Sequence, residues 1–324
     1  MLILLDYPSS QDLKEKKDIS GYPAALFNIA AKYAGLGPHQ FHVIFPELPQ
    51  HNNPNNFFHK KKDCPLDDAG NPRHKAGYLK SVYLPHYHKA REVAATHNLV
   101  LAMGDLSLWC LTGESLNDHR GTILYYDRGI RVIATHHPRA LIKQQSLLPV
   151  VAMDMKKAWQ ESLKPRSVFP RRHIHIVESL GDMDAAVEDI YKAGEFAFDI
   201  ETSNQQITMI CFAPSPTKVY VLPIWFHSQD FWDAPTELQM WLRVQKLMAS
   251  PLRKVAHNSV YDLTYLMEMG IKIRFPVEDT MLKSHSNEIE WLKSLGFLGS
   301  IYCNEKSWKV MRVGKVKDRN KKDE

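Results

Sequence analysis

Cysteine is scarce in this sequence, and its spacing does not form a metal-binding or disulfide framework. The 324 residues contain four cysteines, which stand at positions 64, 110, 211 and 303. No two of them have the C-x-x-C spacing of a zinc ribbon or zinc knuckle. Sparse and unpatterned cysteine of this kind is typical of proteins from a reducing compartment.

Long apolar runs are missing as well. No run approaches the roughly 20 residues that a membrane-spanning helix needs. The first ten residues, MLILLDYPSS, lack the basic region of a secretory signal peptide and read as a first strand. These absences predict a soluble protein with no membrane partner. We expect it in the cytoplasm, and in the host cell cytoplasm if the protein is viral.

An excess of one charge is also largely absent. The chain has 41 Lys and Arg against 36 Asp and Glu, for a formal net charge of +5. This mildly basic balance fits a polyanionic partner such as nucleic acid, although a solvated surface would give the same value. A hydrophobic content of 44% supports packed cores, and the length predicts two domains.

Strand and helix patterns alternate through the first half of the chain. Short apolar runs predict strands at 2–5, 41–45 and 98–104. Helical spacing over 22–37 ends on a glycine stop, whereas the polar stretch 46–76 predicts a long loop, and long loops in compact domains are often functional. The alternation predicts a three-layer α/β domain over residues 1–165.

A basic stretch with two prolines, 164–175, interrupts this pattern and predicts a linker at 166–174. Three strands in sequence, a helix, a strand and a further helix then predict a mixed-sheet α/β domain over 175–304. The final stretch, 305–324, holds eight Lys or Arg and is expected to be a basic, disordered tail.

Two carboxylates follow an apolar strand in the segment FAFDIET. Because alternate side chains of a strand share a face, Asp199 and Glu201 point the same way and Ile200 points to the opposite side. Two adjacent acids repel each other unless a divalent cation lies between them, and carboxylates with water suit Mg²⁺ or Mn²⁺. The alternative is that the strand ends before Asp199 and that both acids are solvated.

A second polar pair lies in KVAHNSVYDLTYL, residues 254–266. Asn258 and Asp262 are four positions apart, so we expect them on one face of a helix that follows a short strand. The alternative is an ordinary asparagine cap with an aspartate on the surface. The D-x-E strand upstream favours a shared site over this alternative.

The order of these motifs resembles the 3′–5′ proofreading exonuclease domain of family A DNA polymerases, which belongs to the DEDD nuclease superfamily. The likeness spans about 175–303. It includes FPVEDTMLKSH, similar to an aspartate-bearing helix of the family, and LKSLGFLGSIYCNEKSWK, similar to bacteriophage members. The resemblance implies a ribonuclease H-like fold and a DNA replication enzyme that hydrolyses DNA with two metal ions.

The resemblance also implies roles for four residues. Asp199 and Glu201 would be metal ligands, Asp262 a ligand of the second ion, and Asn258 a polar contact in the active site. The family's third motif, Tyr-x-x-x-Asp on a later helix, does not occur, because YCNE at 302–305 has the wrong spacing and the wrong acid. The Mg²⁺ or Mn²⁺ site is therefore expected to be incomplete. A downstream polymerase chain is the expected partner, and single-stranded DNA or a primer 3′ end the expected substrate.

The amino-terminal half resembles uracil-DNA glycosylases. VIATHHPRALIKQ is similar to their His-Pro motif, and NLVLAMGDLSLWCLTG to their central strand and helix. LLDYPSSQDLKEKKDISGYPAALF is similar to the family 4 pattern Gly-Glu-Ala-Pro-Gly with its Gly-rich helix start. The resemblance implies a glycosylase-like three-layer α/β domain. Asp6 then takes the position of the motif Glu, His137 that of the motif His, and Ile19 that of the aromatic ring that stacks on the flipped base.

Several positions depart from the glycosylase pattern. Leu5 and Ser9 stand where glycines let the backbone approach the base, and Ile19 replaces the stacking ring. We therefore expect little or no uracil excision. The adjacent His136 and His137 could instead be metal ligands, although neighbours in a turn seldom converge on one ion; more often one is packed and one is exposed.

Three functions remain open from the sequence. The first is a metal-dependent 3′–5′ exonuclease, the amino-terminal part of a phage-type DNA polymerase, completed by a partner chain. The second is a non-catalytic DNA-binding or assembly module of a split polymerase, because one metal ligand is missing. The third is a uracil-DNA glycosylase.

Overall fold

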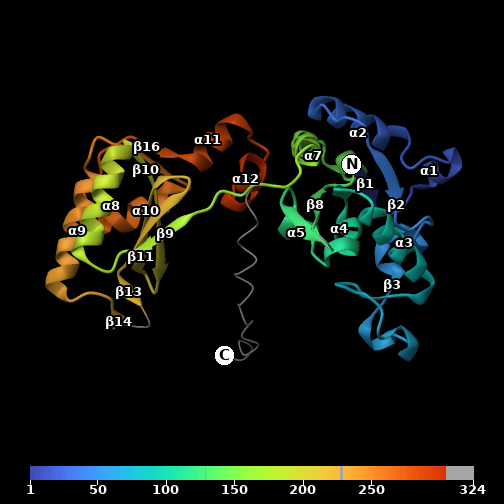
Figure 1. Ribbon diagram of the computed structural model, residues 1–324, viewed down its shortest axis with the longest axis horizontal. Helices are drawn as coiled ribbons and strands as arrows, with labels where there is room; N and C mark the ends of the chain where they lie inside the picture. The colour runs from blue at the N-terminus through green and yellow to red at the C-terminus, as the bar shows by residue number, and fades with distance from the viewer. Residues whose placement is uncertain (128, 227–228, 304–324) are drawn as a thin grey trace, which may run out of the picture. The chain divides into compact units, whose positions relative to one another are not determined.

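The computed structural model describes residues 1–127, 129–226 and 229–303. The chain forms two compact units (Figure 1): unit 1 is Met1–Val168 with the described residues 296–303, and unit 2 is Phe169–Leu295. The expected tail, 305–324, lies outside the described residues. Within the described ranges, no helix has both the length and the apolar character that crossing a membrane requires.

Unit 1 is built on a five-stranded sheet with the order β2-β1-β6-β8-β7. Its strands are β1 (Leu2–Leu5), β2 (Gln40–Val43), β6 (Leu99–Met103), β7 (Ile123–Tyr126) and β8 (Ile130–Thr135). All neighbours are parallel except β7 and β8, which are antiparallel. Every residue of β1 and β6 is buried, as expected for a mostly parallel sheet with both faces covered.

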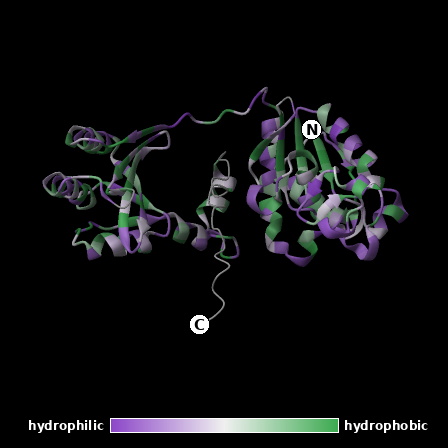
Figure 2. Cartoon of the chain, turned by 90° about the horizontal axis from the view of Figure 1, so that it is seen from below, coloured by the Kyte–Doolittle hydropathy of each residue, from purple (hydrophilic) through white to green (hydrophobic). Residues whose placement is uncertain are grey.

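Helices cover both faces of this sheet. They are α1 (Ser10–Glu15), α2 (Gly21–Ala34), α3 (Leu84–Ala95), α4 (Asp105–Thr112), α5 (Leu116–His119), α6 (Ala140–Lys143) and α7 (Leu148–Ser162). α7 contacts α2, β6 and β8, whereas α3 and α4 pack on the face that carries Leu2 and Leu4. Figure 2 shows the strands of unit 1 in the green of hydrophobic residues. The sequence therefore forms three layers here, as its alternation predicts.

The segment expected to be a loop, 46–76, contains more order than its polar composition suggests. Three short strands form a small sheet: β3 (Phe58–His59), β4 (Arg73–His74) and β5 (Gly77–Leu79). Single 3₁₀ turns lie at Gln50–Asn52, Pro54–Phe57, Lys61–Asp63, Leu66–Asp68, Ser81–Tyr83 and Gln145–Leu147. Buried aromatic rings anchor this segment, since Phe57 stacks on Phe45 with ring centroids 4.3 Å apart. Helix α3 starts only at Leu84, because residues 77–79 pair as β5.

The last described helix, α12 (Leu295–Tyr302), joins unit 1 from Gly296 onward. The guanidinium of Arg120 donates to Asp154 at 2.7 Å, donates to the Ser300 hydroxyl, and lies 4.6 Å from the ring centroid of Phe297. The Lys157 ammonium donates to the Ser300 carbonyl. These buried polar contacts correct the domain boundary expected at 304, because unit 2 ends at Leu295.

Unit 2 contains a six-stranded mixed sheet with the order β16-β15-β10-β11-β12-β9. Its strands are β9 (His173–Ile176), β10 (Glu195–Ser203), β11 (Gln206–Ser215), β12 (Lys218–Pro223), β15 (Arg253–Ala256) and β16 (Val277–Asp279). The pairs β10–β11 and β11–β12 are antiparallel, and the other pairs are parallel. A two-stranded ribbon joins β13 (Trp225–Phe226) to β14 (Gln229–Asp230), and the helices are α8 (Leu180–Ala193), α9 (Ala234–Met248), α10 (Ser259–Glu268) and α11 (Thr280–Asn287).

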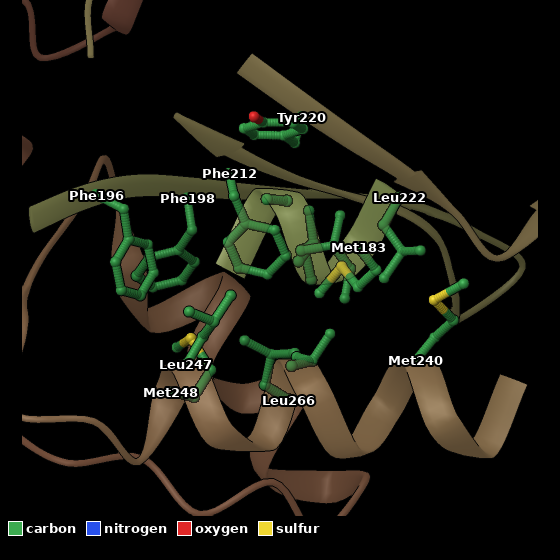
Figure 3. Packing of buried hydrophobic residues seen from close by; sticks show 14 of the residues in the cluster. Met183, Phe196, Phe198, Phe212, Tyr220, Leu222, Met240, Leu247, Met248 and Leu266 are labelled. Carbon is green, nitrogen blue, oxygen red and sulfur yellow. The ribbon is translucent and has the colours of Figure 1, made fainter. Parts of the chain in front are cut away.

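The core of unit 2 lies between one face of the sheet and the helices α8, α9 and α10. Figure 3 shows Phe196, Phe198 and Phe212 pointing from the strands toward Leu247 and Met248. Full burial of one such side chain contributes roughly 1.5–3 kcal/mol. Buried apolar and exposed residues alternate along β10. This alternation fixes the register of the strand, since a slip by one residue would turn the apolar face outward and bury acids instead.

Candidate functional site

Asp199 and Glu201 project from the face of β10 opposite the core. Both are exposed, whereas Phe198 and Ile200 are 4% and 5% exposed. Across the ladder, Asp199 pairs with Cys211 on β11. Burial, together with the nearby carboxylates of Asp199 and Glu201, raises the pKa of the Cys211 thiol to about 11. The strand thus continues past Asp199, and both acids share one face as the alternation predicts.

A third carboxylate reaches this place from α10. Because β10 pairs with β15 only over Glu195–Ala197, the N–H of Ile200 lies beyond the end of that ladder. It donates instead to Oδ1 of Asp262, at 2.9 Å. Asp262 is only 3% exposed. The structure therefore holds Asp262 against the residue that separates Asp199 from Glu201.

The protonation of Asp262 is tuned by its surroundings. Burial raises its pKa to about 6; the hydrogen bond from Ile200 opposes this rise, and the neighbouring carboxylate of Asp199 adds to it. A carboxyl group with this pKa exchanges its proton near neutral pH. Perturbed acids of this kind cluster at functional sites, which marks the place as a candidate site.

Asp279 fixes the start of α10 and with it the position of the third carboxylate. It is the N-cap of α11, where it accepts from the N–H groups of Met281 at 2.8 Å and Leu282 at 3.2 Å. It also accepts from the N–H groups of Asn258 at 3.1 Å and Ser259 at 2.7 Å. Burial raises its pKa, but these hydrogen bonds outweigh burial and lower the pKa below its usual value. An aspartate directly before a helical pattern is the signal that could have identified this cap.

Asn258 does not lie on a helix face with Asp262. It is the N-cap residue of α10, with left-handed backbone at φ 61°, and α10 begins only at Ser259. Asparagine adopts this conformation more readily than most residues. Its side chain is exposed and, within the described structure, does not cap the helix. The prediction of a shared helix face is wrong, while a contact between Asn258 and a substrate stays a prediction.

A hollow of about 300 Å³ lies beside Asp199 on the open face of the sheet. Cys211, His257 and Thr280 contribute to its lining. The ring nitrogen Nδ1 of His257 lies 2.9 Å from the Thr280 hydroxyl. Sequence reasoning did not identify His257, although its place directly before Asn258, where β15 ends, could have suggested it.

The donor atoms fit a hard divalent cation by type, because carboxylate oxygens are the ligands that Mg²⁺ and Mn²⁺ prefer. Their convergence is incomplete. Across 1–127, 129–226 and 229–303, no three His, Cys, Asp or Glu side chains are placed to hold one metal ion. The described part of α12 carries neither Asp nor Glu, and the last two residues of YCNE lie outside the described residues.

The residues predicted from the glycosylase resemblance lie in unit 1. Asp6 and His137 both line a crevice of about 620 Å³, whereas Ile19 is half-buried and does not line it. Asp6 follows β1, Asp105 follows β6, and His137 lies just beyond β8. Crevices outside the carboxyl ends of strands are the usual ligand sites of α/β sheets.

The lining of this crevice includes an acid and a histidine whose pKa values are both shifted by burial. Burial raises the pKa of Asp6 to about 6, although the N–H of Ser107 donates to its carboxylate at 2.7 Å. A Cβ at Gly104 would lie 2.3 Å from the same carboxylate, so that position requires glycine. Burial also lowers the pKa of His137 well below its usual value. Its Nδ1 accepts from the N–H of Arg139 at 3.1 Å, and its Nε2 has no hydrogen-bond partner among the described residues.

Comparison with known proteins gives partial likenesses. No family model matches the chain. The Aedes aegypti Nibbler EXO domain is 15% identical, with 46% of this chain and 77% of that chain covered and a TM-score of 0.35. Escherichia coli RNase D, an exoribonuclease, is 14% identical, with 42% of this chain and 35% of that chain covered and a TM-score of 0.34. The EXD2 exonuclease domain soaked in Mg and dGMP is 13% identical, with 40% of this chain and 68% of that chain covered and a TM-score of 0.27. At such TM-scores the likenesses carry no argument about function.

Proposed function

We propose that unit 2 is a 3′–5′ exonuclease domain with a ribonuclease H-like sheet, and that Asp199, Glu201 and Asp262 form its reaction centre. The observation that carries this proposal is the hydrogen bond from the Ile200 N–H to Asp262. It ties an acid on a helix to the strand residue between two exposed acids. The acid-lined open face of a mixed sheet, next to a hollow, supports hydrolysis of a phosphodiester at this place.

Asp199, Glu201 and Asp262 would hold Mg²⁺ or Mn²⁺ in this proposal. When bound, such ions polarise the scissile phosphate and make a bound water a stronger nucleophile. Asp262 must lose its proton before it can act as a ligand, and with a pKa of about 6 it has largely done so at neutral pH. Asp279 keeps this carboxylate in place by holding the first residues of α10.

We extend the proposal to the substrate and to a partner. Single-stranded DNA or a primer 3′ end is the proposed substrate, in the proofreading portion of a phage-type family A DNA polymerase. A downstream polymerase chain would supply the Tyr-x-x-x-Asp helix. The order of the sequence motifs supports this context, as does the need for a further donor at the carboxylates.

The test is a nuclease assay with Mg²⁺ or Mn²⁺ and one isosteric variant. Asp262→Asn removes the charge but keeps an oxygen that can accept from the Ile200 N–H. The matched control is Glu188→Gln, an exposed i,i+4 partner of Lys192 on α8. We expect a strand labelled at its 5′ end to shorten stepwise from the 3′ end. Asp262→Asn should slow this shortening by more than about 100-fold, which is the largest loss typical of residues that only orient metal ligands. The control variant should shorten the strand at the rate of the unmodified protein. Equal rates in all three proteins would overturn the proposal.

A second candidate function concerns unit 1. The shared crevice of Asp6 and His137 favours a pocket that receives an extruded base, as in a uracil-DNA glycosylase. Base-flipping pockets need a stacking surface, however, and Ile19 neither provides a ring nor lines the crevice. We therefore propose a DNA-binding or assembly role for unit 1 and not uracil excision.

A further inference from the structure

A second hollow in unit 2, of about 320 Å³, lies where the β10–β11 turn meets α9, α10 and the β13–β14 ribbon. We call it the aromatic pocket. The lining residues that matter here are Gln205, Trp225, Asp230, Trp241, Tyr265 and Glu268. Aromatic rings, carboxylates and an amide therefore meet in one place, apart from the hollow beside Asp199.

The turn at the rim of the aromatic pocket has a fixed shape. Ser203 pairs with Gln206, so only two residues, Asn204 and Gln205, connect the strands. Their φ angles are 50° and 64°, as in the type I′ turn that suits a two-residue hairpin. A left-handed backbone is unusual for glutamine, and such strain persists only where the surroundings hold it. The amide of Gln205 is thus presented at the rim by a constrained backbone.

Contacts connect the aromatic pocket to the carboxylates. Thr202, the neighbour of Glu201, shares a 2.6 Å hydrogen bond with the hydroxyl of Tyr261. The ring of Tyr261 lies 5.0 Å from that of Tyr265, which lines the pocket. Because a strand rises about 3.3 Å per residue, the turn begins roughly 10 Å beyond Glu201. A nucleic-acid strand that ends at the carboxylates reaches the pocket within a few nucleotides.

The lining favours a neutral base over a phosphate. The described lining contains no Lys or Arg, so a phosphate finds no cationic partner there and is repelled by Asp230, Glu237 and Glu268. Aromatic side chains such as Trp225 stack on any base. Carboxylates accept hydrogen bonds from exocyclic amino groups, which adenine, cytosine and guanine carry and thymine lacks.

We infer that the aromatic pocket binds one unstacked base of a single-stranded substrate and prefers a base that carries an amino group. This rests on the proposed function only for the direction of the strand. The pocket would act as a specificity site upstream of the 3′ end, so oligonucleotides too short to reach it would bind weakly.

The experiment measures binding without hydrolysis. Fluorescence anisotropy with the full chain in EDTA compares labelled hexamers of deoxycytidine, deoxyadenosine and thymidine. The cytosine and adenine hexamers should bind about 10-fold more tightly than the thymine hexamer. Trp225→Leu should weaken binding of all three about 10-fold, whereas Trp225→Phe, which keeps a stacking ring, should restore most of the affinity.

The exposed acids test the base preference separately from stacking. Glu268→Gln and Asp230→Asn should reduce the difference between cytosine and thymine hexamers, and the control Glu188→Gln should leave it unchanged. Glu268 and Asp230 are both exposed, so these variants are expected to fold. A base preference that these variants and Glu237→Gln all leave unchanged would place the discriminating contact outside the pocket and overturn the inference.

Two further outcomes would also overturn it. One is equal binding of the three hexamers together with no effect of Trp225→Leu. The other is tight binding of a lysine-rich peptide with no base preference, which would identify a cationic partner instead. Since EDTA prevents metal-dependent hydrolysis, the two proposals can fail independently. A base preference without nuclease activity would contradict only the proposed exonuclease function. Nuclease activity without a base preference would contradict only the inference that the aromatic pocket binds a base.

Discussion

The backbone N–H of Ile200 donates to Oδ1 of Asp262 at 2.9 Å, and the two residues are 62 positions apart in the sequence. The bond joins the first turn of α10 to the centre of β10. It places a buried acid with a raised pKa next to two exposed acids on the strand. The metal, pH and nuclease predictions below depend on this contact.

Divalent cations should bind weakly and should need Asp199. Asp199→Ala removes one of the two strand carboxylates and should abolish the heat of binding in calorimetric titrations with Mg²⁺ or Mn²⁺. Weak binding is expected even in the unmodified protein, because three donors do not converge among the described residues and Mg²⁺ gives up its waters reluctantly. Glu188→Gln should titrate like the unmodified protein. Identical titration curves for Asp199→Ala and the unmodified protein would contradict a metal site at Asp199.

The stability of unit 2 should fall as Asp262 loses its proton. The folded pKa of about 6 is above the usual 3.8, so the folded state binds the proton more tightly than the unfolded state. Stability contributed by this group is therefore present at low pH and lost as the pH rises from about 4 to about 6. Asp262→Asn cannot titrate, so its stability relative to the unmodified protein should increase over this range. Urea unfolding at pH 4.5, 6 and 7.5 measures the difference, and a difference that does not change with pH would contradict the assignment.

Removal of Arg120 should destabilise unit 1 strongly. Asp154 is 1% exposed, and among the described residues its remaining hydrogen bond would come from the hydroxyl of Thr135. Breaking a buried ion pair from one side costs about 3–5 kcal/mol. Arg120→Ala should therefore shift the urea midpoint of unit 1 and increase hydrogen exchange in α12, whose Ser300 it contacts. The exposed Arg166→Ala is the control, with an expected effect within about 0.5 kcal/mol.

Uracil excision should be weak or absent. Ile19 does not line the crevice, and by the glycosylase resemblance Leu5 and Ser9 stand where that family has glycines. A uracil-containing oligonucleotide incubated with this chain and then treated with alkali should stay intact. Efficient cleavage that is lost in Asp6→Asn and in His137→Gln would contradict this and make both residues catalytic.

Local patterns in the sequence were sufficient for the elements whose burial alternates or is complete. The apolar run at 2–5 is strand β1, and the two-residue period of FAFDIET placed Asp199 and Glu201 on the open face. In both cases the identity of each residue decides which side is buried, so no distant contact is needed. The mixed sheet of unit 2 follows from the order of such segments.

Contacts between distant segments decided what the sequence could not show. The three-residue strand Val277–Asp279 is too short for a periodic signal and lies in a stretch expected to be helical. The role of Asp279 depends on amides 20 residues away, and the attachment of α12 to unit 1 depends on Arg120. Asn258 lies outside the predicted helix face because its own left-handed backbone makes it the N-cap, so that α10 begins one residue later.

The measurement that tests the central claim most directly is the release of label from the 3′ end of single-stranded DNA with Mg²⁺. The chain is assayed alone and with a downstream polypeptide that carries a Tyr-x-x-x-Asp helix. We expect slow release by this chain alone, because a misplacement of about 1 Å costs on the order of 100-fold in rate. The polypeptide should raise the rate, and Asp262→Asn should abolish release in both arms. No release in either arm, or release that Asp262→Asn leaves unchanged, would contradict the account.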